Sequence, residues 1–220
     1  MNPLLATQAV LDAARAAGAR VVPRTELQAI RRDGAGFLLT TSSGALRAGR
    51  VVNAAGAWAG RVGAMLGADI PVFGAPLQMI VTEPAEPALG RLLAHAERHL
   101  TLKQAGSGGF IIGGGWTAGL DPVHWHPRPL RDSLAGNLWV ACRLLPGLRR
   151  LHVVRSWAAM NIDIDGAPIL GEHPAIPGLF TAVGANGYTL GPLMGQVTAR
   201  LILHADPGRD IAPFGIHRFA

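Results

Sequence analysis

The spacing of apolar and polar positions predicts helices and strands from the first residues of the chain. A helix is expected over residues 3–17, because Asn2 can cap its first turn and Gly18 can end it. The Asp33-Gly34 pair between two apolar runs predicts a β-hairpin. A short helix ending near Gly67 is expected after the last strand of this region. The strands expected here cover residues 20–23, 26–32, 36–41, 46–47 and 50–54.

The middle of the chain has a different pattern, in which apolar strands follow one another with turns between them. Because no helix separates neighbouring strands there, an antiparallel sheet is expected. The whole pattern predicts a mixed α/β (α+β) fold, with the antiparallel part inserted between two α/β ends. The elements expected from here on are strands at 76–83, 99–104 and 110–114, a helix at 129–145, strands at 153–160, 168–171 and 179–184, and a helix from Pro192 to about His204.

Composition narrows the class of protein. Apolar residues make up 49% of the chain and charged residues 15%, which is typical of a well-buried globular protein. The net charge is +6, but the arginines are spread along the chain and form no stripe with aromatic residues. We therefore expect no nucleic-acid partner.

Three further features bear on localisation. Cys142 is the one cysteine of the sequence, so an internal disulfide cannot form and a cytoplasmic protein is expected. The N-terminus shows no secretory signal pattern. Residues 174–199 lack charged side chains, yet Pro177, Pro192 and several glycines argue against a transmembrane helix. A buried strand, a turn and the start of a helix are expected there.

Three stretches, taken together, resemble a known family. They are Val51-Val52-Asn53-Ala54-Ala55-Gly56-Ala57-Trp58-Ala59, then Arg155-Ser156-Trp157 with Asp165-Gly166-Ala167-Pro168-Ile169-Leu170-Gly171, then Gly178-Leu179-Phe180-Thr181-Ala182-Val183-Gly184-Ala185-Asn186-Gly187-Tyr188-Thr189-Leu190-Gly191-Pro192 followed by Gly195. In this order and spacing they resemble the D-amino-acid oxidase superfamily of FAD-dependent oxidoreductases, which includes glycine oxidase and sarcosine oxidase. The stretches 76–83 and 161–166 look most similar to the B subunit of opine oxidase and to D-hydroxyproline dehydrogenase.

The resemblance implies an incomplete FAD-binding, Rossmann-like domain at residues 1–73 and 151–220, with an inserted antiparallel substrate or cap domain at 74–150. It implies noncovalent FAD. Small residues after a buried strand let backbone approach a ligand closely, and a helix beginning near Gly191-Pro192 would stabilise negative charge on the reduced flavin. The implied cofactor-binding residues are Leu27, Ala54, Ala55, Gly56, Trp58, Asn186, Gly187, Tyr188, Thr189, Leu190 and Gly191.

The implied reaction is hydride transfer to flavin from the carbon beside the nitrogen of an amine, imino acid or amino acid. It gives an imine, which water hydrolyses. Tyr188, the one tyrosine, is the candidate catalytic residue, with simple loop packing as the alternative.

Similar enzymes place an arginine shortly before the Asp-Gly turn to pair with a substrate carboxylate. Met160-Asn161 stand there instead and Arg155 lies too far upstream, so simple α-amino acids are less favoured as substrates.

One expected feature of this family is missing. No strand with a G-x-G-x-x-G turn precedes Pro3, and Gly113-Gly114-Gly115 is expected to form a hairpin end in the substrate sheet, not a phosphate loop. Three explanations stay open: a start site further upstream, a fragment, or another flavoenzyme subunit that supplies the missing half. The alternative function is therefore a non-catalytic fragment or a structural subunit.

The remaining polar clusters favour structural interpretations. His95 and His99 are four residues apart but lack a third ligand, so a surface pair is expected and no metal site. The His124-Trp125-His126 segment is expected to be a solvated or substrate-lid loop, and Asp165-Gly166 a turn. Trp58 and Trp157 are expected to pack.

Overall fold

The computed structural model describes residues 2–219 and divides the chain into two compact units. The first runs up to residue 72 and resumes at 163, and the second covers 73–162. The second unit is thus inserted into the first, and the mixed α/β class predicted from the sequence is confirmed. Within residues 2–219, no helix combines the length and apolarity needed to span a membrane.

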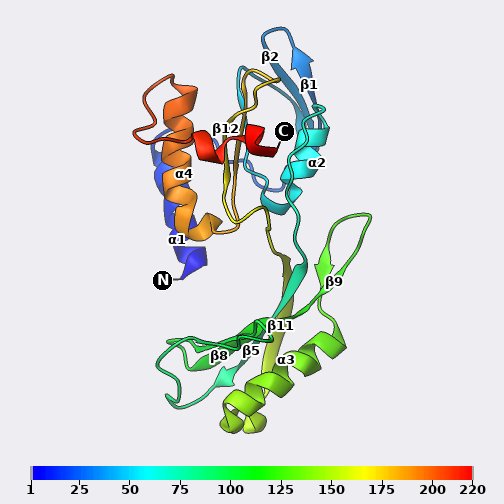
Figure 1. Ribbon diagram of the computed structural model, residues 1–220, viewed down its shortest axis with the longest axis vertical. Helices are drawn as coiled ribbons and strands as arrows, with labels where there is room; N and C mark the ends of the chain where they lie inside the picture. Colours follow the sequence, from blue (N-terminus) through cyan, green and yellow to red (C-terminus); the bar gives the residue numbers. More distant parts are fainter. Residues whose placement is uncertain (1, 220) are drawn as a thin grey trace. The chain divides into compact units, whose positions relative to one another are not determined.

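The first unit contains two small sheets and two longer helices (Figure 1). One sheet is an antiparallel meander in the order β1-β2-β3, and the other has the order β12-β13-β4. The elements, with η for a short 3-10 helix, are α1 (Pro3–Ala16), β1 (Leu27–Asp33), β2 (Gly36–Thr41), β3 (Gly44–Ala48), β4 (Val51–Asn53), η1 (Gly56–Trp58), α2 (Ala59–Ala64), β12 (Ile169–Glu172), β13 (Leu179–Val183), α4 (Gly187–Ile202), η3 (Ala212–Phe214) and η4 (Ile216–Phe219).

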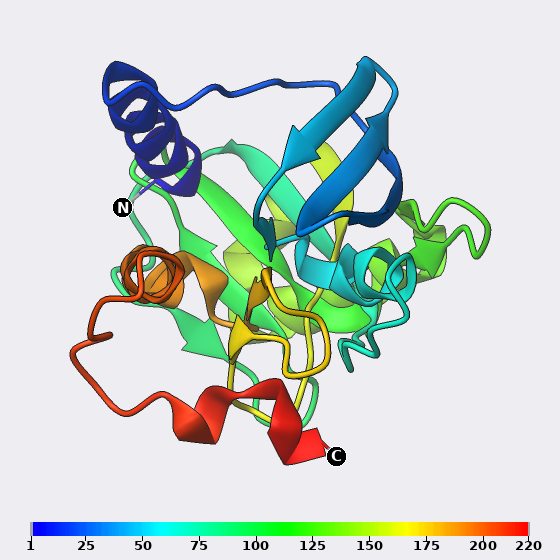
Figure 2. The ribbon, with the colours of Figure 1, turned by 90° about the horizontal axis from the view of Figure 1, so that it is seen from above.

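The sheet β12-β13-β4 mixes two kinds of pairing. β12 pairs antiparallel with β13, whereas β13 pairs parallel with β4, so that Leu179 stands opposite Val51 and Thr181 opposite Asn53. Helix α4 packs beside β12 and β13, as Figure 2 shows. Met194 and Val197 of α4 are buried together with Leu170 of β12.

The second unit is a five-stranded sheet covered by one helix, with a small hairpin beside it. The sheet has the order β11-β5-β8-β7-β6, and every pair in it is antiparallel, as the sequence predicts. Helix α3 packs on β8 (Figure 1), where Val140 and Ala141 join Ile80, Leu102 and Ile112 in the core. The elements are β5 (Pro76–Pro84), β6 (Leu93–Ala94), β7 (Thr101–Gln104), β8 (Gly109–Thr117), β9 (Gly119–Leu120), β10 (Pro127–Arg128), α3 (Arg131–Leu144), η2 (Pro146–Arg150) and β11 (Val153–Met160).

Two predicted elements differ from the structure. Residues 20–23 form no strand, because a strand needs a neighbour to pair with and none of the described segments pairs with this one. Helix α4 begins at Gly187, before the predicted start at Pro192, and Asn186 O accepts from the backbone N–H groups of Thr189 and Leu190. Proline inside the helix removes a single N–H donor, and the helix continues past it.

The segment 151–162 lies in the second unit, although the sequence interpretation assigns it to the last part of the FAD-binding domain. The reason is β11, which pairs with β5 from Met160 opposite Pro76 to Val153 opposite Thr82. The assignment of the two units to cofactor and substrate stays a prediction.

Candidate functional site

Two of the predicted cofactor-binding segments leave the same edge of one sheet. Residues 54–56 follow β4 directly, and residues 184–186 follow β13. Because β4 and β13 run parallel with Asn53 opposite Thr181, their carboxyl ends lie next to each other. In α/β folds this is the edge at which ligands bind.

The turn after β4 is held from beneath by Asn53. This side chain is buried; its Nδ2 donates to Ala59 O at 2.8 Å and its Oδ1 accepts from Ala55 N at 3.3 Å. Gly56 has φ 58°, a left-handed conformation that side chains disfavour. The turn therefore has a fixed shape, and the exposed Ala54 leaves its surface free of bulky groups.

The sequence interpretation does not assign Asn53 a role of its own. The available signal is its position, a polar residue that ends an apolar strand and precedes two alanines and a glycine. Trp58, which is expected to pack, is 38% exposed. Trp157 is partly buried, with the Arg155 guanidinium 5.5 Å from its ring centroid.

The start of α4 provides the second half of this edge. The first N–H groups of a helix lack intrahelical partners and carry partial positive charge, and the Asn186 side chain does not cap them here. Gly187, Gly191 and Gly195 are spaced four apart along the helix, and a Cβ at any of them would have no neighbour within 4 Å. Tyr188, in the first turn, is 51% exposed. An anionic or electron-rich group could therefore approach this helix end closely.

Leu27 is not brought to this edge by any described contact. It begins β1, opposite Thr41, in the other sheet of the unit. Its predicted role beside the adenine stays a prediction.

The position near Met160-Asn161, where the resemblance implies a substrate arginine, lies at the end of β11. The Asn161 backbone N–H donates to Ala75 O at 3.2 Å. Arg155 lies earlier on the same strand and is exposed. Within the second unit, the structure thus shows no guanidinium at the implied position itself, as the sequence indicates.

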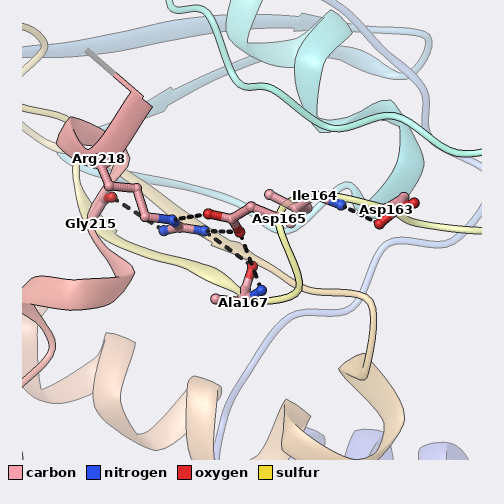
Figure 3. A network of polar contacts seen from close by, with 6 residues as sticks. All are labelled: Asp163, Ile164, Asp165, Ala167, Gly215 and Arg218. Atoms are coloured by element: carbon pink, nitrogen blue, oxygen red, sulfur yellow. Dashed lines mark hydrogen bonds and ion pairs between the residues drawn. The ribbon is translucent and has the colours of Figure 1, made fainter.

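The segment Asp163–Ala167 is tied to the C-terminal part of the chain by a polar network (Figure 3). Arg218 donates from Nε to Asp165 Oδ2 at 2.7 Å and from Nη2 to Asp165 Oδ1 at 2.9 Å. The same guanidinium donates to Ala167 O at 3.1 Å and to Gly215 O at 3.3 Å. The hydrogen bonds from Arg218, and next that from the backbone N–H of Ala167, hold the pKa of Asp165 well below its usual range.

This pair predicts a pH-dependent stability. A carboxyl whose pKa is depressed on folding stabilises the fold above its unfolded pKa of about 4, and that stabilisation is lost as the pH falls toward the folded value. Arg218→Gln is therefore expected to lower the melting temperature at pH 7. The difference in melting temperature from the unsubstituted chain should shrink below about pH 4. There the unfolded chain binds a proton at the Asp165 carboxyl, whereas the folded chain keeps this carboxyl ionised. Melting temperatures of both proteins across this range test it, and a difference independent of pH would contradict it.

The histidine clusters are held by local hydrogen bonds. His95 and His99 lie in the connection between β6 and β7, where Arg98 N donates to His95 Nδ1 at 3.3 Å. His124 bonds to Asp121 Oδ2 at 2.7 Å, and this contact, followed by the Val123 N–H, lowers the pKa of Asp121 to about 2. Within residues 2–219, no three His, Cys, Asp or Glu side chains group as a metal ion would require.

Comparison with known proteins decides the family. The family model described as FAD dependent oxidoreductase, DAO, matches residues 1–201. The chain belongs to this family. The members of this family are FAD-dependent, so FAD is the cofactor of the family.

The chain is similar to several characterised members of the DAO family. It is 32% identical over 213 residues to glycine oxidase of Geobacillus kaustophilus, covering 96% of this chain and 55% of the relative. The B subunit of opine oxidase from Agrobacterium tumefaciens is 29% identical over 220 residues, covering 100% of this chain and 57% of the relative. The solved structure of L-proline dehydrogenase from P. horikoshii superposes with a TM-score of 0.83 at 25% identity, covering 97% of this chain and 59% of that structure. The chain thus spans about half the length of the curated relatives it matches.

Proposed function

We propose that this chain forms the flavin-ring and substrate side of an oxidoreductase that oxidises the C–N bond of an amine, imino acid or amino acid. The observation that carries the proposal is the shared sheet edge, where the turn after β4 meets the start of α4 in a member of an FAD-dependent family. When bound, FAD would accept the hydride from the carbon beside the nitrogen, and the resulting imine would be hydrolysed by water.

The chain's own residues would hold and orient the reactants. Asn53 fixes the turn of residues 54–56, against which the cofactor backbone would lie, and Gly187 and Gly191 leave the helix end open to the ring. The free N–H groups of α4 would stabilise negative charge there. Tyr188, half-exposed in the same turn of α4, would contact the substrate or the flavin.

Two surfaces of the first unit are uncovered, which supports the proposal that a further polypeptide segment completes the cofactor site. Helix α1 has no buried residue, and its Leu4 and Leu5 are 79% and 69% exposed. Strand β4 pairs with β13 along one edge, and among the described strands none pairs with its other edge. Apolar helices and parallel strands are usually covered. A strand–turn–helix segment carrying the glycine-rich phosphate turn would cover both kinds of surface and complete the cofactor site.

A second function is favoured by the sequence itself. No G-x-G-x-x-G turn follows a strand and opens a helix in these residues, so the pyrophosphate has no cradle here. The second candidate is therefore a structural subunit, or a non-catalytic fragment, that does not hold FAD. Several relatives are themselves named as subunits, including the B subunit of opine oxidase and the beta subunit of sarcosine oxidase.

Flavin content separates the two functions. Material purified from the cells that make the chain is expected to carry flavin absorbance, to release FAD on acid treatment, and to lose colour anaerobically when the substrate amine or amino acid is added. Recombinant chain soaked with FAD shows whether these residues suffice. Colourless native material would support the structural subunit and reject the enzyme.

Two glycine substitutions test the role of α4 in that material. Gly187→Leu places a side chain at the first helical residue and is expected to lower flavin content about tenfold or more, because it blocks approach to the free N–H groups. Gly195→Leu is the matched control, since it adds the same side chain on the same open helix face two turns further on. Equal flavin content in both variants would contradict the assignment.

A further inference from the structure

A surface hollow of about 260 Å³ lies on the second unit, and none of its lining residues is among those assigned to flavin. It opens between the connection that precedes β7 and the second half of α3. Its lining combines positive charge with apolar surface: His95, Glu97 and Arg98 from the connection, and Trp139, Arg143 and Leu144 from the helix.

Both arginines lie over aromatic rings, and neither guanidinium is paired with an acid among residues 2–219. The Arg143 guanidinium lies 4.0 Å from the centroid of the Trp139 ring, and Arg98 lies 5.8 Å from that of Trp116. Among residues 2–219, neither guanidinium forms an ion pair or donates a hydrogen bond to protein. A guanidinium that lies over a ring keeps its N–H donors available, so both can bind an oxyanion.

The other polar groups of the hollow are one histidine and one glutamate. The Arg98 backbone N–H donates to His95 Nδ1 at 3.3 Å, which holds the imidazole next to Arg98. Glu97 is the one acid in the lining, and within the described residues it pairs with neither arginine. The lining therefore has a net positive charge.

The hollow is held in shape by the packing of α3 on β8. Gly136 lies so close to Trp116 that a Cβ there would stand 2.7 Å from the ring atom Cδ2. Asn137 Oδ1 accepts from Gly115 N at 3.0 Å, and Val140, at the base of the hollow, is buried. A preformed site loses little freedom when it binds a ligand.

We propose that this hollow binds the carboxylate of a small organic acid, whose hydrocarbon part lies on Trp139 and Leu144. Two guanidiniums favour a planar oxyanion, and Trp139, 54% exposed, offers an apolar surface that an inorganic ion cannot use. The site lies within the second unit and is independent of the flavin proposal.

Tryptophan fluorescence of the full chain tests the site, with butyrate as the probe and inorganic phosphate in a second arm. Butyrate is expected to change the emission saturably and to bind more tightly than phosphate. Arg98→Gln and Arg143→Gln are each expected to raise the butyrate dissociation constant about tenfold, which corresponds to one lost charge-assisted hydrogen-bonded pair. Arg149→Gln, an exposed arginine outside the hollow, is the matched control and should change nothing.

Further variants keep the test decisive. Trp139→Phe should remove the fluorescence change while calorimetry still detects binding. If a glutamine variant fails to fold by circular dichroism, Arg143→Lys keeps the charge and loses the planar fork, and a several-fold weakening is expected. No saturable butyrate binding, phosphate binding as tight as butyrate, or equal affinity in the arginine variants and Arg149→Gln would each overturn the proposal.

Discussion

Gly113→Val is expected to destabilise the second unit by about 3 kcal/mol or more, because the position has no room for any side chain. Gly113 is buried in β8, between Met79 of β5 and Thr101 of β7. A Cβ there would stand 2.5 Å from Gln78 O and 3.1 Å from Met79 Cα, and both are backbone atoms that cannot move without separating the strands. Urea unfolding followed by circular dichroism measures the change.

The control is Gly106→Val in the turn between β7 and β8. Nothing lies within 4 Å of a Cβ at this exposed glycine, so a change within about 0.5 kcal/mol is expected. The comparison also decides what the three consecutive glycines are for. If Gly113→Val were as stable as the unsubstituted chain and instead lost affinity for phosphate, the triplet would be a phosphate turn.

Gln78→Leu is the second substitution with a large expected effect. Gln78 is fully buried on β5; its Nε2 donates to Leu130 O and to Ser156 Oγ, both at 3.1 Å, and its Oε1 accepts from Leu130 N at 2.8 Å. Leucine fills a similar volume but leaves the backbone N–H of Leu130 without a partner, whereas the Leu130 carbonyl keeps the hydrogen bond from the Leu134 N–H at 3.0 Å. We expect a loss of about 2 kcal/mol in the free energy of unfolding, since one unpaired backbone group that is shielded from water costs about 1–3 kcal/mol.

This loss would be measured by the same urea titration, with Gln196→Leu as the control. Gln196 is exposed on α4 and forms no described side-chain hydrogen bond, so its replacement should be nearly neutral. Because Leu130 immediately precedes α3, Gln78→Leu should also increase amide exchange in the first turn of that helix. Unchanged stability would mean that water replaces the lost partners.

The candidate site shows which of its features the local sequence pattern predicts and which it does not. The alanines and glycine after β4 and the glycines of α4 stand out in the sequence because small residues after a buried strand allow close approach of a ligand. The local pattern does not predict how the turn is held. Asn53 bonds to Ala59, six residues on, only because α2 folds back beneath the strand end.

The glycine triplet is a case where local pattern allows two interpretations. Three glycines after a strand fit both a phosphate turn and a crowded sheet. The sequence predicts a hairpin end in the sheet because residues 120–124 cannot begin a helix cleanly, whereas all three glycines lie inside β8, which continues to Thr117. What each glycine avoids is a contact with atoms distant in sequence: Gln78 O for Gly113, His99 O for Gly114, and Arg98 O for Gly115.

The amino-acid sequence alone was enough to predict the mixed α/β class, the 33–34 hairpin, the antiparallel character of the middle segment and the family. All of these depend on periodicity, turn residues or short motifs, which act within a few residues. Tertiary structure decided that β11 joins β5, that residues 20–23 form no strand, that α4 begins at Gly187, and that β4 and β13 end side by side. These features depend on pairing between segments far apart in the chain. The absence of a G-x-G-x-x-G turn from these 220 residues is also seen in the sequence alone.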